Sequence, residues 1–232
     1  MKIASKVASH LGSYSSNVKA NIKNLGVTFD PSMLLDKHIR LLTHTCFFHL
    51  RNLAKLRGVL SKAEMEMAIH AFISSRLDYC NALFSCLNKT SITRLQQVQN
   101  AAARLLTRSK RTCHITPILS ALHWLPVHLR SHFKMLVFTY RAVHGQAPAY
   151  ITDLIKPHST TRALRSSEQG LLGVPRTRLK TKGDRAFEVV APRLWNKLPP
   201  ELRASVSVEV FKGQLKTHLF RQAFGASGEV SL

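Results

Sequence analysis

The chain has 232 residues, and its 34 Lys and Arg against 12 Asp and Glu give a formal charge of +22 at pH 7. Such a charge favours a polyanionic partner, because cationic side chains that neutralise phosphates release condensed counterions. No two carboxylates are adjacent in the sequence, which argues against two-metal nucleotidyl transfer and metal-dependent strand cleavage, since both need clustered oxygen ligands.

The first predicted element is a strand. We expect residues 1–24 to be a poorly ordered remnant, and the β-prone run 25–29 to end at the turn signal Asp30-Pro31. The pattern then becomes helical, and one apolar face predicts a helix that ends at Arg57-Gly58. The residues of that face are Ile39, Leu42, Cys46, Leu50 and Leu53.

A second long helix is predicted after Ser61, because Ser61 and Glu64 have the spacing of a capping box. Its apolar stripe consists of Met65, Ile69, Phe72, Leu83 and Leu87. Arg76 falls in the same sector, and a cation there costs free energy unless it is paired or reaches solvent. Two solutions stay open, an ion pair with Asp78 or a helix break near Ser74-Ser75.

A third helix is predicted from about Ser91, with Leu95, Val98, Ala102 and Leu105 facing inward. Arg104 and Arg108 lie outward with Gln97, and Lys110 and Arg111 follow the end of the helix. These cations have two interpretations: they complement the negative end of the helix dipole, or they bind phosphate.

A short helix around Pro117 and a turn at 123–126 precede a long amphipathic helix. Its buried face is predicted to contain Leu129, Phe133, Leu136, Tyr140 and Val143. Arg130, Lys134 and Arg141 share a narrow face on its other side. Such a stripe is either a solvated surface or a contact with a phosphate backbone.

Residues 159–182 are rich in Ser, Thr, Arg and Gly and predict a basic linker with a small β-ribbon around 171–182. Arg176, Arg178, Lys180 and Lys182 alternate, so a strand would place all four on one face. Both a backbone-contacting ribbon and a charged, aggregation-resistant edge strand fit this pattern. A helical unit over 183–224 and a tail over 225–232 complete the prediction.

Catalytic and metal-binding patterns are incomplete. His128 and His132 have helical i,i+4 spacing, but Leu129 stands where a zinc protease needs Glu. Cys113-His114 with His123 does not form a four-ligand zinc pattern. GxSxG and GxxxxGK[ST] motifs are absent from the sequence. We therefore expect no metal site, no cofactor and no enzymatic activity of this chain alone.

Cysteine usage and hydropathy predict an intracellular protein of the nucleus or cytoplasm without a membrane partner. The four cysteines form no CxxC pair, which is typical of reduced thiols. No apolar run reaches the length of a membrane span, and residues 1–24 lack the apolar block of a secretory signal.

Several co-linear motifs resemble the region beyond the polymerase palm of LINE-type non-LTR retrotransposon reverse transcriptases, most closely those of vertebrate elements. The resemblance spans residues 11–224. Its motifs are NLGVTFD (24–30), DKHI (36–39), SRLDYCNA (75–82), RLQ (94–96), QNAAAR (99–104), HWLPV (123–127), YRAVHG (140–145) and APRLWNKLP (191–199).

The resemblance covers only the thumb-like region and the C-terminal domain of that family. The polymerase's aromatic-x-Asp-Asp motif and the endonuclease residues have no counterpart in this sequence. What it implies is a grip on a template-primer duplex, element RNA or target DNA, with the missing polymerase domain as a further partner.

The sequence thus predicts a mainly α-helical bundle of six to eight helices, with a thumb-like domain over 25–158. Its predicted function is to bind RNA or DNA backbone, without reading sequence, through the helix 91–108, the Arg130 face and the ribbon 176–182. The alternative is an inert or protein-docking fragment that needs the missing palm and has no independent activity.

Overall fold

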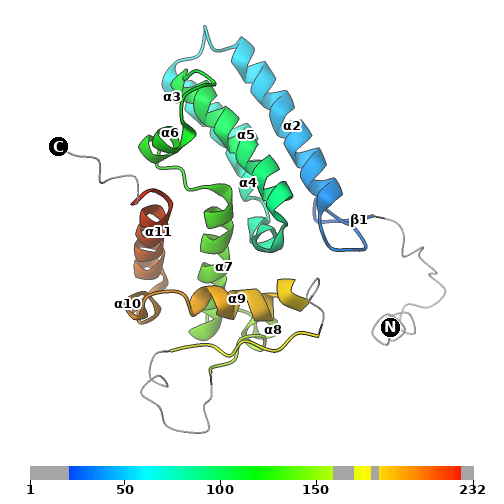
Figure 1. The fold of residues 1–232 in the computed structure, drawn as a ribbon, viewed down its shortest axis with the longest axis vertical. Helices are drawn as coiled ribbons and strands as arrows, with labels where there is room; N and C mark the ends of the chain where they lie inside the picture. The colour runs from blue at the N-terminus through cyan, green and yellow to red at the C-terminus, as the bar shows by residue number, and fades with distance from the viewer. Residues whose placement is uncertain (1–20, 159–169, 179–182, 226–232) are drawn as a thin grey trace.

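The computed structural model describes residues 21–158, 170–178 and 183–225, and this part of the chain is mainly helical, as predicted (Figure 1). The described residues form ten α-helices and one two-stranded antiparallel sheet. In chain order the elements are β1 (Ile22–Asn24), β2 (Val27–Phe29), α2 (Asp36–Lys55), α3 (Lys62–Ile69), the π-helix η1 (His70–Ser74), α4 (Ser75–Asp78), the 3-10 helix η2 (Asn81–Cys86), α5 (Lys89–Thr107), α6 (Ile115–Ala121), α7 (Val127–Val143), α8 (Ala149–Thr152), the 3-10 helix η4 (Gly183–Arg185), α9 (Phe187–Trp195), α10 (Pro200–Arg203) and α11 (Val208–Phe224).

The N-terminal strand is half of a tight hairpin. Asn24 pairs with Val27, so the loop contains only Leu25 and Gly26. Both loop residues have positive φ, 45° and 82°, as a type I′ turn requires. Residues 22–24 therefore form β1, although the sequence assigned them to a poorly ordered segment.

The predicted capping box at Ser61 is confirmed. The Ser61 hydroxyl accepts a hydrogen bond from the Glu64 N–H at 3.3 Å, and the Glu64 carboxylate accepts one from the Ser61 N–H at 2.8 Å. This pairing satisfies two backbone donors that the first turn of a helix leaves unpaired.

The prediction of a second long, regular helix is wrong, because the chain forms α3, η1 and α4 in succession and the helical run then ends before Tyr79. The wider π turn moves the buried stripe to steps of four residues, so Ile73 is buried and Phe72 is 44% exposed. Arg76 therefore points to solvent. Neither expected solution is the one in the structure: Asp78 forms its ion pair with Arg130, and the chain stays helical through residues 74–75, where the π-helix η1 meets α4.

Two main clusters of buried apolar residues hold the fold together. The first joins β2 and α2 to α5, and the second joins α7, α9 and α11. A smaller cluster of Ala103, Leu119 and Phe224 connects α5 and α6 to the end of α11. Figure 1 shows α2 beside α5 in the upper half, with α7 continuing into the lower half.

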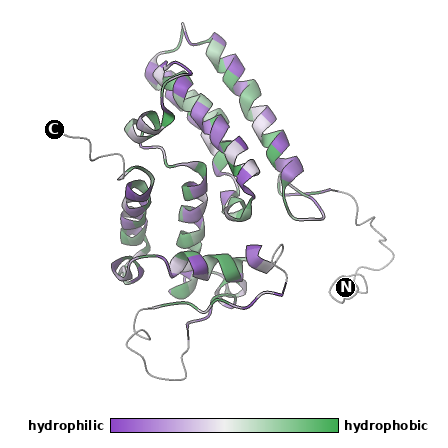
Figure 2. Cartoon of the chain, in the orientation of Figure 1, coloured by the Kyte–Doolittle hydropathy of each residue, from purple (hydrophilic) through white to green (hydrophobic). Residues whose placement is uncertain are grey.

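Helices α2 and α5 run parallel, as shown by polar contacts that join their N-terminal ends to each other and their C-terminal ends to each other. Near their beginnings the Ser91 hydroxyl donates to the Asp36 carboxylate at 3.2 Å, and near their ends the Arg108 guanidinium donates to the Arg57 carbonyl at 3.1 Å. Hydrophilic and hydrophobic residues alternate along both helices (Figure 2). The C-terminal ends of two helices are thus placed together.

Helix α7 buries Leu129, Leu136 and Tyr140, as predicted. Val143 was expected inside but is 42% exposed, because it is the last residue of the helix and lies beyond the second cluster. The buried Tyr140 hydroxyl donates to the Ser205 carbonyl at 2.7 Å, which ties α7 to the segment after α10.

The predicted β-ribbon is wrong over the described residues 170–178, where only Leu172 forms a β-bridge, to Pro157. On one side of this segment the His158 N–H donates to the Leu171 carbonyl at 3.0 Å and the Gly173 N–H to the Lys156 carbonyl at 2.9 Å, and its other backbone partners are side chains of α9 and its C-terminal cap. The Asn196 amide bonds both the N–H and the carbonyl of Leu172, at 2.9 and 2.8 Å, and the Trp195 indole donates to the Gly170 carbonyl at 2.9 Å.

Within the described ranges, no helix combines the length and the apolar character that crossing a bilayer requires.

Candidate nucleic-acid interface

A groove of about 690 Å³ lies between the C-terminal halves of α2 and α5. Four arginines line it: Arg51, Arg57, Arg104 and Arg111. Phe47, Leu50, Ala54, Ala101 and Leu105 supply apolar surface, and Gln97, Asn100 and Ser109 add neutral polar groups. No described carboxylate lines the groove, so its positive charge is not neutralised locally.

A smaller hollow of about 270 Å³ continues the groove past the end of α5. The two share Arg57 and Leu105, and the smaller one adds Arg108 and Lys62. We call the two together the α2–α5 groove. It has six cations, and no carboxylate among the described residues that line it.

Two of these arginines are held in place by backbone carbonyls. Arg104 donates to the Cys113 carbonyl at 3.2 Å, and its Nε is buried without a hydrogen-bond partner. Arg108 ends α5 in the left-handed conformation, with φ of 55°, and donates to the Arg57 carbonyl. These bonds direct two guanidinium groups before any ligand arrives, which lowers the entropic cost of binding.

The cations of the groove also stabilise the two helices. Because α2 and α5 are parallel, both place the negative ends of their dipoles here, and the surrounding cations are favourable by about 0.3–1 kcal/mol each in exposed positions. Dipole complementarity accounts for cations near the final turns, such as Arg108. Arg51 lies a full turn before the end of α2, where this effect has weakened.

The sequence did not identify Arg51, Arg57 and Lys62 as members of the candidate interface. Arg51 lies in α2, Arg57 follows its C-terminal cap and Lys62 begins α3, whereas the predicted contacts began with the helix 91–108. Helical periodicity places Arg51 outside the core, but it gives no information on which neighbouring helix runs alongside. Lys110, which was predicted to bind, is exposed and lines neither part of the groove.

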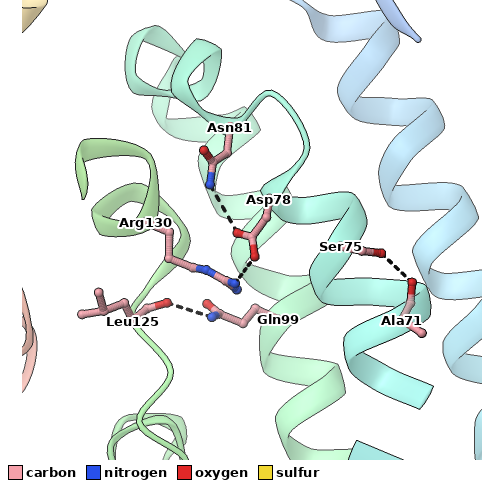
Figure 3. A network of polar contacts seen from close by, with 7 residues as sticks. All are labelled: Ala71, Ser75, Asp78, Asn81, Gln99, Leu125 and Arg130. Atoms are coloured by element: carbon pink, nitrogen blue, oxygen red, sulfur yellow. Dashed lines mark hydrogen bonds and ion pairs between the residues drawn. The ribbon is translucent and has the colours of Figure 1, made fainter. Parts of the chain in front are cut away.

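The predicted face of α7 lies apart from the α2–α5 groove. Arg130 forms an ion pair with Asp78 of α4, and Asp78 also accepts from the Asn81 amide at 3.2 Å (Figure 3). The Lys134 ammonium lies 5.7 Å from the centroid of the Phe138 ring. Arg141 is half-buried near the end of α7. Arg130 is thus joined to a carboxylate that links α4 to α7.

Arg176 and Arg178 are exposed in the segment that lies against α9 and its C-terminal cap, while Thr177 between them donates to Asp184 at 2.6 Å. The predicted alternation therefore holds over these three residues without a strand. Lys180 and Lys182 lie outside the described residues. Of the nine predicted contacts that the structure describes, Arg104, Arg108 and Arg111 line the α2–α5 groove.

Several described carboxylates have structural partners. Asp30 accepts from the backbone N–H groups of Ser32 and Leu34, both at 3.0 Å. Asp36 bonds Ser91, and Asp184 forms an ion pair with Arg193 at 3.0 Å. Among the described residues, His, Cys, Asp and Glu form no group of three or more that could hold a metal ion.

The predicted histidine pair is close, with ring centroids 5.9 Å apart in α7. Burial lowers the pKa of both rings, and for His132 the pKa falls to about 4, with smaller effects of His128 and Lys197. His132 is therefore neutral over the physiological pH range.

Comparisons with protein families, with curated protein sequences and with solved structures find no match to this chain.

Proposed function

We propose that the protein binds the phosphate backbone of RNA or DNA through the α2–α5 groove, without reading sequence and without catalysis. The observation that carries this proposal is the set of four arginines that line the main groove with no carboxylate among its described lining residues. Arginine suits this task because its planar guanidinium remains charged and forms paired hydrogen bonds with phosphate oxygens.

The shape of the groove supports a single strand or the edge of a duplex. Backbone-directed binding needs a cationic channel along the strand, and apolar surface accepts bases or sugars without a sequence code. Arg51 and Arg57 on one wall and Arg104 and Arg111 towards the other provide cations on both sides.

We also propose that the chain derives from the thumb-like and C-terminal regions of a LINE-type reverse transcriptase. The co-linear motifs of the sequence support this proposal, and the basic groove is consistent with a region that grips a template. A polymerase domain supplied by another chain would then be a second partner.

Protein docking is a second candidate function, favoured by exposed apolar residues on another face of α2. Leu41 and Phe48 are 53% and 50% exposed, and Phe72 beside them is 44% exposed. The rings of Phe48, His49 and Phe72 follow one another at centroid distances of 5.5 and 5.2 Å. Exposed patches of this kind are typical of interaction surfaces.

The experiment is a titration of fluorescent single-stranded RNA and of duplex DNA with the purified chain over a salt series, with light scattering to follow its oligomeric state. Saturable submicromolar binding by a monodisperse protein, with a steep salt dependence, supports backbone binding. Weak binding by a self-associating chain contradicts it and favours the docking fragment.

A further inference from the structure

A second hollow, of about 520 Å³, lies where the two main clusters meet, and it shares no lining residue with the α2–α5 groove. Its walls come from η1, α4, η2, the turn before α7, α7 itself and α11. The lining residues are His70, Ser74, Asp78, Asn81, His123, Trp124, Leu125, Arg130, Phe133, Lys134 and Lys216. We call it the junction pocket, and its volume is within the usual range for small-molecule sites, about 300–1,000 Å³.

One wall of the junction pocket is aromatic and held in place. Trp124 is half-buried and lies edge-on to the His70 ring at a centroid distance of 5.8 Å. His123 stacks on Phe220 of α11 at 5.6 Å, and the backbone N–H of Trp124 donates to the Leu119 carbonyl at 2.9 Å. Phe133 adds a further ring. Such a wall suits a planar ring, because stacking on aromatic side chains accepts any base.

The polar groups of the pocket have both signs. Arg130 and Asp78 neutralise each other in their ion pair, so Lys134 and Lys216 leave a surplus of positive charge for an anion. The Asp78 side chain remains 42% exposed and has lone pairs beyond those used by Arg130 and Asn81. Figure 3 shows the Asp78 carboxylate between its partners Arg130 and Asn81. A carboxylate accepts hydrogen bonds from hydroxyl groups and repels phosphate.

We propose that the junction pocket binds one ribonucleotide unit, with the base against the Trp124 wall, the ribose hydroxyls towards Asp78 and the phosphate towards Lys134 and Lys216. A planar ring, neutral donors and an anion occur together in this class of ligand, and each meets one part of the lining. The unit is either a free ribonucleoside monophosphate or a single nucleotide splayed out of an RNA strand. The site is independent of the α2–α5 groove and of the function proposed for it.

The test is a titration of the full chain with adenosine 5′-monophosphate, followed by tryptophan fluorescence. Trp195 is only 1% exposed, so quenching by the ligand reports on Trp124. We expect saturable binding, and about tenfold weaker binding of 2′-deoxyadenosine 5′-monophosphate, because one hydrogen bond to a charged acceptor is lost. Asp78 is left unchanged, since its loss would leave Arg130 without its ion pair.

The variant K134Q/K216Q removes both pocket ammonium groups and is expected to weaken binding of the monophosphate about tenfold or more. The matched control R141Q/R221Q removes two charges from the same helices, α7 and α11, outside the pocket, and should bind as the unaltered chain does. Because all four side chains lie outside the buried cores, the variants should fold, which circular dichroism checks.

Four results would overturn the proposal. They are no saturable fluorescence change at millimolar adenosine monophosphate, the same loss of affinity in K134Q/K216Q and R141Q/R221Q, the same affinity for the deoxy and the ribo monophosphate, or competition by inorganic phosphate as strong as that by the monophosphate. Competition by a ribo-oligonucleotide distinguishes the two sources of the ligand. If the oligonucleotide displaces the monophosphate, and K134Q/K216Q weakens that displacement, the ligand is a nucleotide of an RNA strand. If the oligonucleotide does not displace the monophosphate, the ligand is a free nucleotide. Changes in Arg51 and Arg111 of the α2–α5 groove leave the monophosphate titration unchanged, so a failure of either proposal can be told from a failure of the other.

Discussion

Replacing Arg51 and Arg111 by glutamine removes two cations of the groove that form no hydrogen bond or ion pair with other described residues, so the scaffold stays intact. For single strands each neutralised phosphate adds about −0.7 to the slope of log K against log salt, so the double variant should be shallower by about 1.4. If the two affinities converge near 1 M salt, the variant then binds about 25-fold more weakly at 0.1 M. The result follows only if both side chains contact phosphate.

The assay is fluorescence anisotropy of a labelled single-stranded RNA at several salt concentrations. The matched control is K55Q/K89Q, which removes the same charge from exposed positions of the same two helices, α2 and α5, outside the groove. Its slope should stay close to that of the unaltered chain. Equal slopes for both double variants would refute the reasoning, because the field of the whole molecule would then account for binding without a defined groove.

Three further predictions concern the fold. Replacing Ser61 by alanine removes the capping box and should lower the free energy of unfolding by about 1 kcal/mol, measured by urea denaturation; an unchanged midpoint would contradict the role of this cap. His132, with its pKa lowered to about 4 by burial, stays neutral in the folded chain while the unfolded chain gains a proton below its ordinary pKa of 6.5, so stability should fall as pH drops from 6.5 towards 4. The variant H132Q should show a shallower fall, and parallel curves would show that other groups cause it. Burial raises the pKa of the Cys46 thiol to about 11, so a thiol reagent should modify the exposed Cys80 and Cys113 in the native protein and reach Cys46 only on unfolding.

Local rules predicted much of the helical fold. The pairing of Ser61 with Glu64 and the inward face of α7 depend on neighbours three or four residues apart, which the sequence displays directly. The π turn over 70–74 has no comparable local signal, and it changed which residue, Phe72 or Ile73, lies in the core. A prediction from helical periodicity assumes a constant number of residues per turn, so it assigns the wrong buried residues where the helix widens into a π turn.

The candidate site was less accessible to sequence reasoning, because it depends on how distant helices meet. Cationic character placed Arg104, Arg108 and Arg111 at the surface, and that was enough to nominate them. Arg51 and Arg57 join them only because α2 and α5 are parallel, a property of the tertiary fold. Arg130 also lies on a cationic helix face in the sequence, but in the fold it pairs with Asp78, which is 52 residues earlier in the chain.

Arginine footprinting tests the central claim most directly. The chain is treated with a guanidinium-modifying reagent with and without saturating single-stranded RNA, and modified sites are quantified by mass spectrometry. Binding in the α2–α5 groove predicts strong protection of Arg51, Arg57 and Arg111, with little change at Arg76 and Arg221, which are exposed outside the groove. Uniform protection of all these arginines, or protection confined to those outside the groove, would contradict it.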